Sequence, residues 1–154
     1  MDPVLGRFFD HFRRLHEACK THFAGLDSTA LDWSPGEGMN SIAVLATHTA
    51  GSEKFWIGDI VMQDPSGRVR EAEFTVTGTD VAGLSRLLDS SLATIQGAFE
   101  RLSLQDLTES RTSPLDGVEY DIAWSIAQSL QHTALHLGHI QLTRQLLDVG
   151  RVKS

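Results

Sequence analysis

The chain has 154 residues, of which 41% are hydrophobic and 21% charged, and its formal net charge is −7. This length fits one domain, and the ordinary composition excludes a chain that is disordered throughout. The acidic excess argues against nucleic acid or an anionic membrane as a partner, because phosphate groups are bound by clustered lysine and arginine. We therefore expect a single domain over residues 1–154.

The class of protein is narrowed further by what the sequence lacks. Cys19 is the only cysteine, which excludes an intrachain disulfide. No apolar run reaches the ~18 residues of a membrane span. The start, Met1-Asp2-Pro3, lacks the basic and apolar regions of a signal peptide. These features predict a cytoplasmic protein that binds neither membrane nor nucleic acid.

Helical periodicity begins near the N-terminus. A first helix is expected from about Pro3 to Leu26, because apolar residues recur there at spacings of three and four. Cys19 lies on that apolar stripe, so a buried and unreactive thiol is expected. Residues 28–38 are typical of a connection, in which Trp33-Ser34-Pro35-Gly36 is a turn signal.

A second helix is expected from Asn40 or Ser41, both good N-caps, to about Met62, with His48 near its middle. Residues 63–78 form a loop. Within it, residues 74–77 are expected to be a short extended piece, and Glu71 and Glu73 are expected to be solvated.

Two more helices follow. The third is expected from about Asp80 to Leu102, and residues 103–117 form a connection in which Asp116-Gly117 is a strong turn signal. The fourth is expected from about Tyr120 to Asp148, a length of about 43 Å. Four amphipathic helices of similar length predict an all-α four-helix bundle. The connections of about a dozen residues leave room for a crossover.

Three of the seven histidines lie within eight residues of the last helix. His132 and His136 are four residues apart, so they point to the same side and can reach one metal at about 2.0 to 2.1 Å. His48, at the middle of a different helix, is the natural third ligand, because metal sites in bundles use side chains from facing helices. We take these three as the candidate metal ligands.

Other readings of the histidines remain open at this point. His139 follows His136 by three residues, a spacing that also chelates, but it lies about 10 Å along the axis from His132. Histidines inside a bundle can instead hydrogen-bond to serine or glutamine, or lie exposed. The remaining three, His11, His16 and His22, have spacings of five and six that do not chelate on a helix, so we expect them on the surface.

The other notable side chains are expected to be structural. At helical spacing, aromatic residues more often fill a core than line a ligand pocket. These aromatic residues are Trp33, Phe55, Trp56 and Trp124. The arginines that could hold an anionic ligand, Arg68, Arg70 and Arg111, are expected to be exposed. Thr133 follows His132 where the zincin motif requires glutamate, so no catalytic base is assigned.

Three segments of the chain resemble the DinB family of bacterial bundle proteins, also called DinB/YfiT-like metalloenzymes. Their order and wide separation match the family. The segments are Trp33-Ser34-Pro35-Gly36-Glu37-Gly38-Met39-Asn40-Ser41-Ile42, Leu45-Ala46-Thr47-His48 followed by Phe55-Trp56, and His132-Thr133-Ala134-Leu135-His136-Leu137-Gly138-His139-Ile140.

This resemblance implies a four-helix bundle with one long crossover and a divalent metal, typically nickel or zinc, on His48, His132 and His136. It favours the pair His132–His136 over His136–His139. Characterised relatives include transferases and isomerases that use mycothiol, bacillithiol or glutathione, and homodimers are frequent in the family. We expect no counterpart here of the additional domain that some thiol-dependent relatives carry.

The leading functional hypothesis is therefore a metal-dependent enzyme that acts on a small molecule, as a low-molecular-weight thiol transferase or with hydrolase-like chemistry. The alternative is a bundle that binds a metal or small ligand without catalysis. A third hypothesis is an interaction bundle whose histidines bind nothing. The sequence assigns no catalytic or thiol-binding residue.

Overall fold

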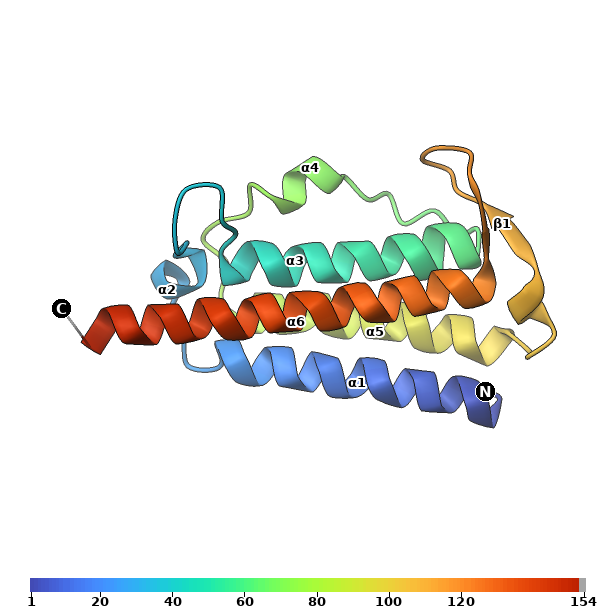
Figure 1. Ribbon diagram of the computed structural model, residues 1–154, viewed down its shortest axis with the longest axis horizontal. Helices are drawn as coiled ribbons and strands as arrows, with labels where there is room; N and C mark the ends of the chain where they lie inside the picture. The colour runs from blue at the N-terminus through green and yellow to red at the C-terminus, as the bar shows by residue number, and fades with distance from the viewer. Residues whose placement is uncertain (153–154) are drawn as a thin grey trace.

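The computed structural model describes residues 1–152, which form a bundle of four long helices (Figure 1). The long helices are α1 (Pro3–Phe23), α3 (Ile42–Glu53) with its π-helical continuation η1 (Lys54–Val61), α5 (Val81–Arg101) and α6 (Ile122–Val152). The short elements are α2 (Ser28–Asp32), α4 (Arg70–Glu73), η2 (Asp106–Thr108), β1 (Ser110–Thr112) and β2 (Glu119–Asp121). The predicted all-α bundle is confirmed. No helix among the described residues is long and apolar enough to cross a membrane.

Side chains at the N-termini explain where three of the long helices begin. The Asp2 carboxylate accepts a hydrogen bond from the Val4 amide before α1. Ser41 caps α3 and Asp80 caps α5 in the same way. Each cap satisfies one of the backbone donors that an α-helix leaves free in its first turn.

The bundle contains one long crossover connection, as the resemblance implies. In Figure 1, α3 and α5 run in one direction and α1 and α6 in the other. Residues 62–80 return along the bundle past α3 before α5 begins, and they carry α4 with them. α1 and α3 each pack against α5 and α6, so α1 and α3 lie diagonally across the bundle from each other.

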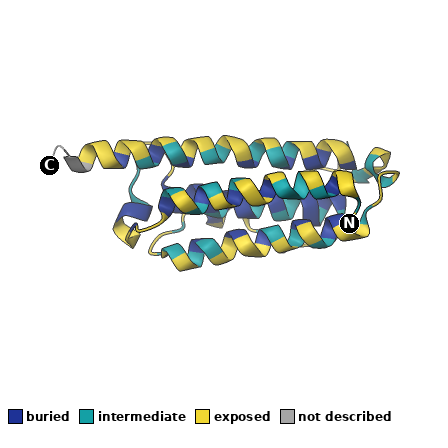
Figure 2. Cartoon of the chain, turned by 90° about the horizontal axis from the view of Figure 1, so that it is seen from below, coloured by how far each residue is buried: buried dark blue, intermediate teal, exposed yellow. Residues whose placement is uncertain are grey.

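Buried apolar side chains form two clusters along the bundle axis, and Figure 2 shows exposed positions along the outer surfaces of the helices. The first cluster lies toward α2 and includes Phe23, Leu31 and Ile140. The second lies toward the β1–β2 hairpin and includes Phe12 and Phe99, whose ring centroids are 6.3 Å apart.

The connections differ from the prediction in two places. Residues 28–32 form the short helix α2, which Asp27 caps by accepting from the Ala30 amide. Residues 74–77 form no strand. Instead α4 precedes them, and the Phe74 amide donates to the Glu71 carbonyl in a tight turn.

Helix boundaries also differ from the prediction. α1 ends at Phe23 rather than Leu26, and α6 extends to Val152 rather than Asp148. The last helix begins at Ile122 rather than Tyr120, because Tyr120 pairs with Arg111 across the antiparallel β1–β2 hairpin. The Asp116-Gly117 turn within that hairpin is confirmed, with Gly117 at a φ of 72°. The second half of the predicted second helix is a π-helix, which ends where the Met62 amide donates to the Ile57 carbonyl at 3.1 Å.

Candidate functional site

Three histidines converge between α3 and α6. His48 comes from α3, and His132 and His136 come from successive turns of α6. Each offers one ring nitrogen such that all three lie within 4.8 Å of one another. The ring centroid of His48 is 5.0 Å from that of each of the other two, and the Nε2 atoms of His132 and His136 are 3.1 Å apart. The structure thus brings together the three candidate ligands.

The ring of His48 is held from its far side by Glu73. His48 Nδ1 lies 2.7 Å from Glu73 Oε2. Burial alone would raise the pKa of Glu73, but hydrogen bonds from Arg68 and His48 outweigh it and hold that pKa below its usual value. Because an ionised carboxylate only accepts, Nδ1 donates to it, and Nε2 is the ring nitrogen of His48 that this bond leaves available to a ligand. Carboxylate partners of this kind orient metal-binding histidines.

Glu73 reaches His48 because the crossover lays α4 over α3. Arg68 fixes the carboxylate with two nitrogens, of which Nη2 lies 2.8 Å from Oε2. The expectation of a solvated Glu73 is wrong, since only 6% of the residue is exposed, and Arg68 is half-buried rather than exposed. Glu71 is exposed as expected. The sequence places Glu73 25 residues from His48, with no local pattern linking them.

Gly51 makes room for this contact. It lies on α3, one turn after His48, and a Cβ atom there would overlap the Glu73 carboxylate. The missing side chain therefore allows the carboxylate to approach α3 closely.

His132 and His136 are neutral at pH 7. Burial lowers the pKa of His132 to about 4, and any positive charge on His48, together with that of Arg68, acts in the same direction. Burial and its histidine neighbours lower the pKa of His136 to about 3. Neutral imidazoles keep the lone pairs that bind divalent metals, and three of them form a donor set that suits zinc or nickel. The residues present therefore fit such an ion.

His139 lies beyond the group of three. Its Nδ1 atom is 3.4 Å from His136 Nδ1. The other ring nitrogen of His136, Nε2, is the one that faces His132. His139 is exposed, and among the described residues the three-histidine group does not include it.

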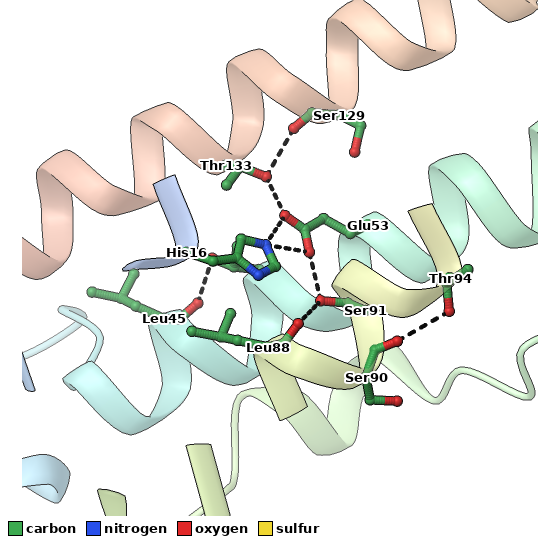
Figure 3. Close-up of polar contacts among 10 residues, drawn as sticks. His16, Leu45, Glu53, Leu88, Ser90, Ser91, Thr94, Ser129 and Thr133 are labelled. Atoms are coloured by element: carbon green, nitrogen blue, oxygen red, sulfur yellow. Dashed lines mark hydrogen bonds and ion pairs between the residues drawn. The ribbon is translucent and has the colours of Figure 1, made fainter. Parts of the chain in front are cut away.

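His16 contradicts the prediction of a surface residue, because it is fully buried. Its Nε2 atom lies 2.8 Å and 3.0 Å from the two carboxylate oxygens of Glu53 (Figure 3). The sequence did contain a signal, since His16 follows Phe12 by four residues and precedes Cys19 by three on the apolar stripe of α1. His11 is exposed as predicted, and His22 is half-buried.

Cys19 is fully buried, and burial together with the charge of Glu53 raises the pKa of its thiol to about 12. The prediction of an inert thiol agrees with this. Arg70 is exposed as expected and lies over the ring of Phe74, whereas Arg111 is half-buried rather than exposed and pairs with Glu109 at 2.8 Å.

The aromatic residues divide into two groups. Trp33 packs against the cluster toward α2, as expected of a core residue. Trp56 and Trp124 instead form a group with Tyr120 near the hairpin, where the ring centroids of Trp56 and Trp124 are 5.4 Å apart. Trp124 is 46% exposed, so this second group is not core. Phe55 contacts Trp56 at its edge.

Solved structures resemble this chain at low sequence identity. A conserved protein from Enterococcus faecalis gives a TM-score of 0.80 at 15% identity, over 96% of this chain and 98% of that protein. YfiT from Bacillus subtilis, described as a probable metal-dependent hydrolase with an unusual four-helix bundle topology, gives 0.74 at 13% identity, over 94% and 89%. A mycothiol-dependent maleylpyruvate isomerase gives 0.65 at 15% identity, over 88% of this chain and 60% of its own. These identities establish a shared fold alone.

The sequence itself provides the assignment to a family. No curated protein matches the chain. The family model of the DinB superfamily matches residues 11–140, a range that includes all three converging histidines. The chain belongs to the DinB superfamily.

Proposed function

We propose that this protein is a divalent-metal-dependent enzyme whose metal ligands are His48, His132 and His136. The observation that carries the proposal is the convergence of three ring nitrogens within 4.8 Å from two facing helices. The low pKa values of His132 and His136 support it, because neutral imidazoles with free lone pairs are the form that binds metal. YfiT, a structural neighbour, is described as a probable metal-dependent hydrolase.

The reaction we propose is transfer of a low-molecular-weight thiol, such as mycothiol, bacillithiol or glutathione, to a small electrophilic molecule in the cytoplasm. A nickel or zinc ion, when bound, supplies a Lewis acid that lowers the pKa of a thiol or water and so provides a nucleophile near neutral pH. Two residues of the crossover orient His48. Glu73 keeps the proton of His48 on Nδ1, and Arg68 fixes the position of the Glu73 carboxylate.

The buried carboxylates near the histidines bear on the type of reaction. Glu73 is hydrogen-bonded to His48 and Arg68. Glu53 accepts hydrogen bonds from the buried hydroxyl groups of Ser91 and Thr133. Neither is free to act as a general base. This favours thiol transfer over hydrolysis, because the pKa of a free thiol, about 8.5, lies much closer to neutral pH than that of water, about 15.7, and so needs less lowering by a metal. The lack of a free base also supports the alternative of metal binding without catalysis.

A metal-dependent turnover assay tests the proposal. Chelator-treated protein, with and without added nickel or zinc, is assayed with each thiol against electrophilic substrates and, separately, with esters and amides. We expect turnover that needs both metal and thiol, that is lost in His132→Ala, and that is kept in the exposed control His11→Ala.

Three results would count against the proposal. Metal-dependent hydrolysis without thiol would replace the transferase by a hydrolase. Tight metal binding with no turnover would leave the non-catalytic alternative. Turnover that is equal with and without metal would contradict both. The homodimer expected from the resemblance stays a prediction, which sedimentation velocity on the 16.9 kDa chain tests.

A further inference from the structure

A layer of polar side chains crosses the middle of the bundle at Glu53 (Figure 3). All four long helices contribute one residue to it. Glu53 of α3 contacts His16 of α1 at 2.8 Å, accepts from Ser91 Oγ of α5 at 2.6 Å, and accepts from Thr133 Oγ1 of α6 at 2.7 Å. At most 1% of each of these residues is exposed. One carboxylate therefore joins four helices inside the protein.

This layer separates the two apolar clusters. On α1, His16 lies between Phe12 of the cluster near the hairpin and Cys19 of the cluster near α2. On α5, Ser91 lies in the same way between Ile95 and Leu88. A buried polar group lowers stability unless it is paired, so apolar residues here would be the simpler way to fill the core. The presence of the layer calls for a role that apolar packing does not supply.

The layer adjoins the three-histidine group along α3 and α6. Thr133 is the residue after His132 on α6, and Glu53 follows His48 by five residues on α3. The bond from Thr133 Oγ1 to Glu53 Oε1 therefore joins the two helices that carry the histidines, one residue along α6 from His132. A slip of α6 by one helical turn would move it about 5.4 Å along its axis and separate rings that now lie 5.0 Å apart.

We propose that Glu53 and Thr133 are positioning residues that set the register of α6 against α3 and so hold His132 and His136 opposite His48. His16 and Ser91 hold the Glu53 carboxylate in its place from the other two helices. The inference rests on the proposed function only in naming metal as the ligand that this register serves.

The chain offers a closely matched pair of variants. Thr49 and Thr133 each directly follow a histidine of the site, are fully buried, and lie within hydrogen-bond distance of the carbonyl four residues earlier. Only Thr133 also donates to another helix. Thr133→Val and Thr49→Val therefore remove the same hydroxyl from similar surroundings, and only the first removes the bond between α3 and α6. Glu53→Gln provides a second variant that keeps the side chain's shape.

The test compares cobalt affinity, the visible spectrum of bound cobalt, and urea unfolding of the chelator-treated protein. We expect Thr133→Val to weaken cobalt binding by about tenfold and to alter the spectrum, as loss of partners that orient ligands does in other metal sites. Thr49→Val should leave affinity within about twofold of wild type. Glu53→Gln should also weaken cobalt binding and alter the spectrum of bound cobalt. Unfolding curves show that each variant is folded before its affinity is interpreted.

A metal-free measurement separates this inference from the proposed function. Nuclear Overhauser contacts between the rings of His48 and His132 report their register without cobalt, and we expect them to weaken in Thr133→Val but not in Thr49→Val. Equal effects of the two variants on affinity and on these contacts would overturn the inference. If wild-type protein binds no cobalt, the proposed function fails, and the ring contacts still decide whether Thr133 sets the register.

Discussion

Contacts between residues far apart in the sequence determine the surroundings of His48. Its partner Glu73 and the Arg68 that holds Glu73 both belong to the crossover, so no spacing rule connects them to α3. Gly51 on α3 is the local sequence feature that this contact requires. The reason for a glycine there becomes clear once α4 and Glu73 are placed against α3. The histidines on α6, in contrast, are neighbours by helical periodicity and could be predicted from spacing alone.

Gly51→Ala should displace Glu73 from His48. An alanine in a helix normally stabilises relative to glycine by about 0.5 to 1 kcal/mol, and Gly97 on α5, where a Cβ would meet nothing within 4 Å, is expected to show this gain. At Gly51 the new methyl group overlaps the carboxylate, so we expect a net loss of stability and about tenfold weaker metal binding. Urea unfolding and cobalt titration measure the two effects. A Gly51→Ala protein with normal affinity would show that Glu73 does not orient His48.

Cys19 should resist thiol reagents until the protein unfolds. A pKa of about 12 in place of 9.0 lowers the thiolate fraction at pH 8 by roughly 1000-fold, and the thiolate is the reactive form. Because the folded pKa is raised, the protonated thiol favours the folded state below pH 9, and this stability is lost as pH rises toward 12. Alkylation rates at pH 8, compared with those in denaturant, test this. Rapid alkylation of folded protein would contradict it.

Among the elements, the long helices follow from apolar periodicity and capping, whereas the irregular pieces do not. Ser41 and Asp80 could be identified as caps from residue type. The π-helix Lys54–Val61 has no periodic signature of its own, and strands β1 and β2 are three residues each, too short for an alternating pattern. The hairpin is nevertheless indicated by its Asp116-Gly117 turn, where Gly117 has a φ of 72°.

Gly117→Ala should weaken the hairpin, because a left-handed conformation costs an alanine about 1 kcal/mol or more relative to glycine. Gly138→Ala is the matched control on α6, where a Cβ meets nothing within 4 Å, and it should raise stability slightly. Amide hydrogen exchange at residues 110–121 locates the effect. Unchanged protection there in Gly117→Ala would contradict the assignment of this turn.

At the scale of the molecule, two apolar clusters and the polar layer between them are expected to unfold as one domain. Phe99→Ala in the cluster near the hairpin should cost about 3 to 5 kcal/mol, as truncation of a fully buried phenylalanine does. Variants that keep only Trp33 or only Trp124 report on opposite ends of the bundle by fluorescence. Phe99→Ala should shift both transitions equally in urea. A shift confined to the Trp124 reporter would show that the clusters unfold independently.

The class of fold could be read from the sequence because helical periodicity is a local property that is clear in α1 and α5, and because Ser41 marks the start of α3, whose residues are buried on nearly every side. The buried polar layer could not be predicted from the sequence, because it joins side chains of α1 and α3, which lie diagonally across the bundle from each other. His16 illustrates this limit: its position on an apolar stripe indicated burial, but its partner Glu53 lies 37 residues away on the opposite helix. The three-histidine group could be predicted in part. Helical spacing brings His132 and His136 together, whereas His48 joins them only through the packing of α3 on α6.

The most direct test of the central claim is elemental analysis of protein purified without a polyhistidine tag. Wild type is compared with His48→Ala, His132→Ala, His136→Ala and the exposed control His139→Ala. We predict about one divalent metal per chain in wild type and in His139→Ala, and loss of that metal in each of the other three variants. Protein that takes up no nickel or zinc even after incubation, or that keeps its metal when His48, His132 or His136 is replaced, would contradict the account.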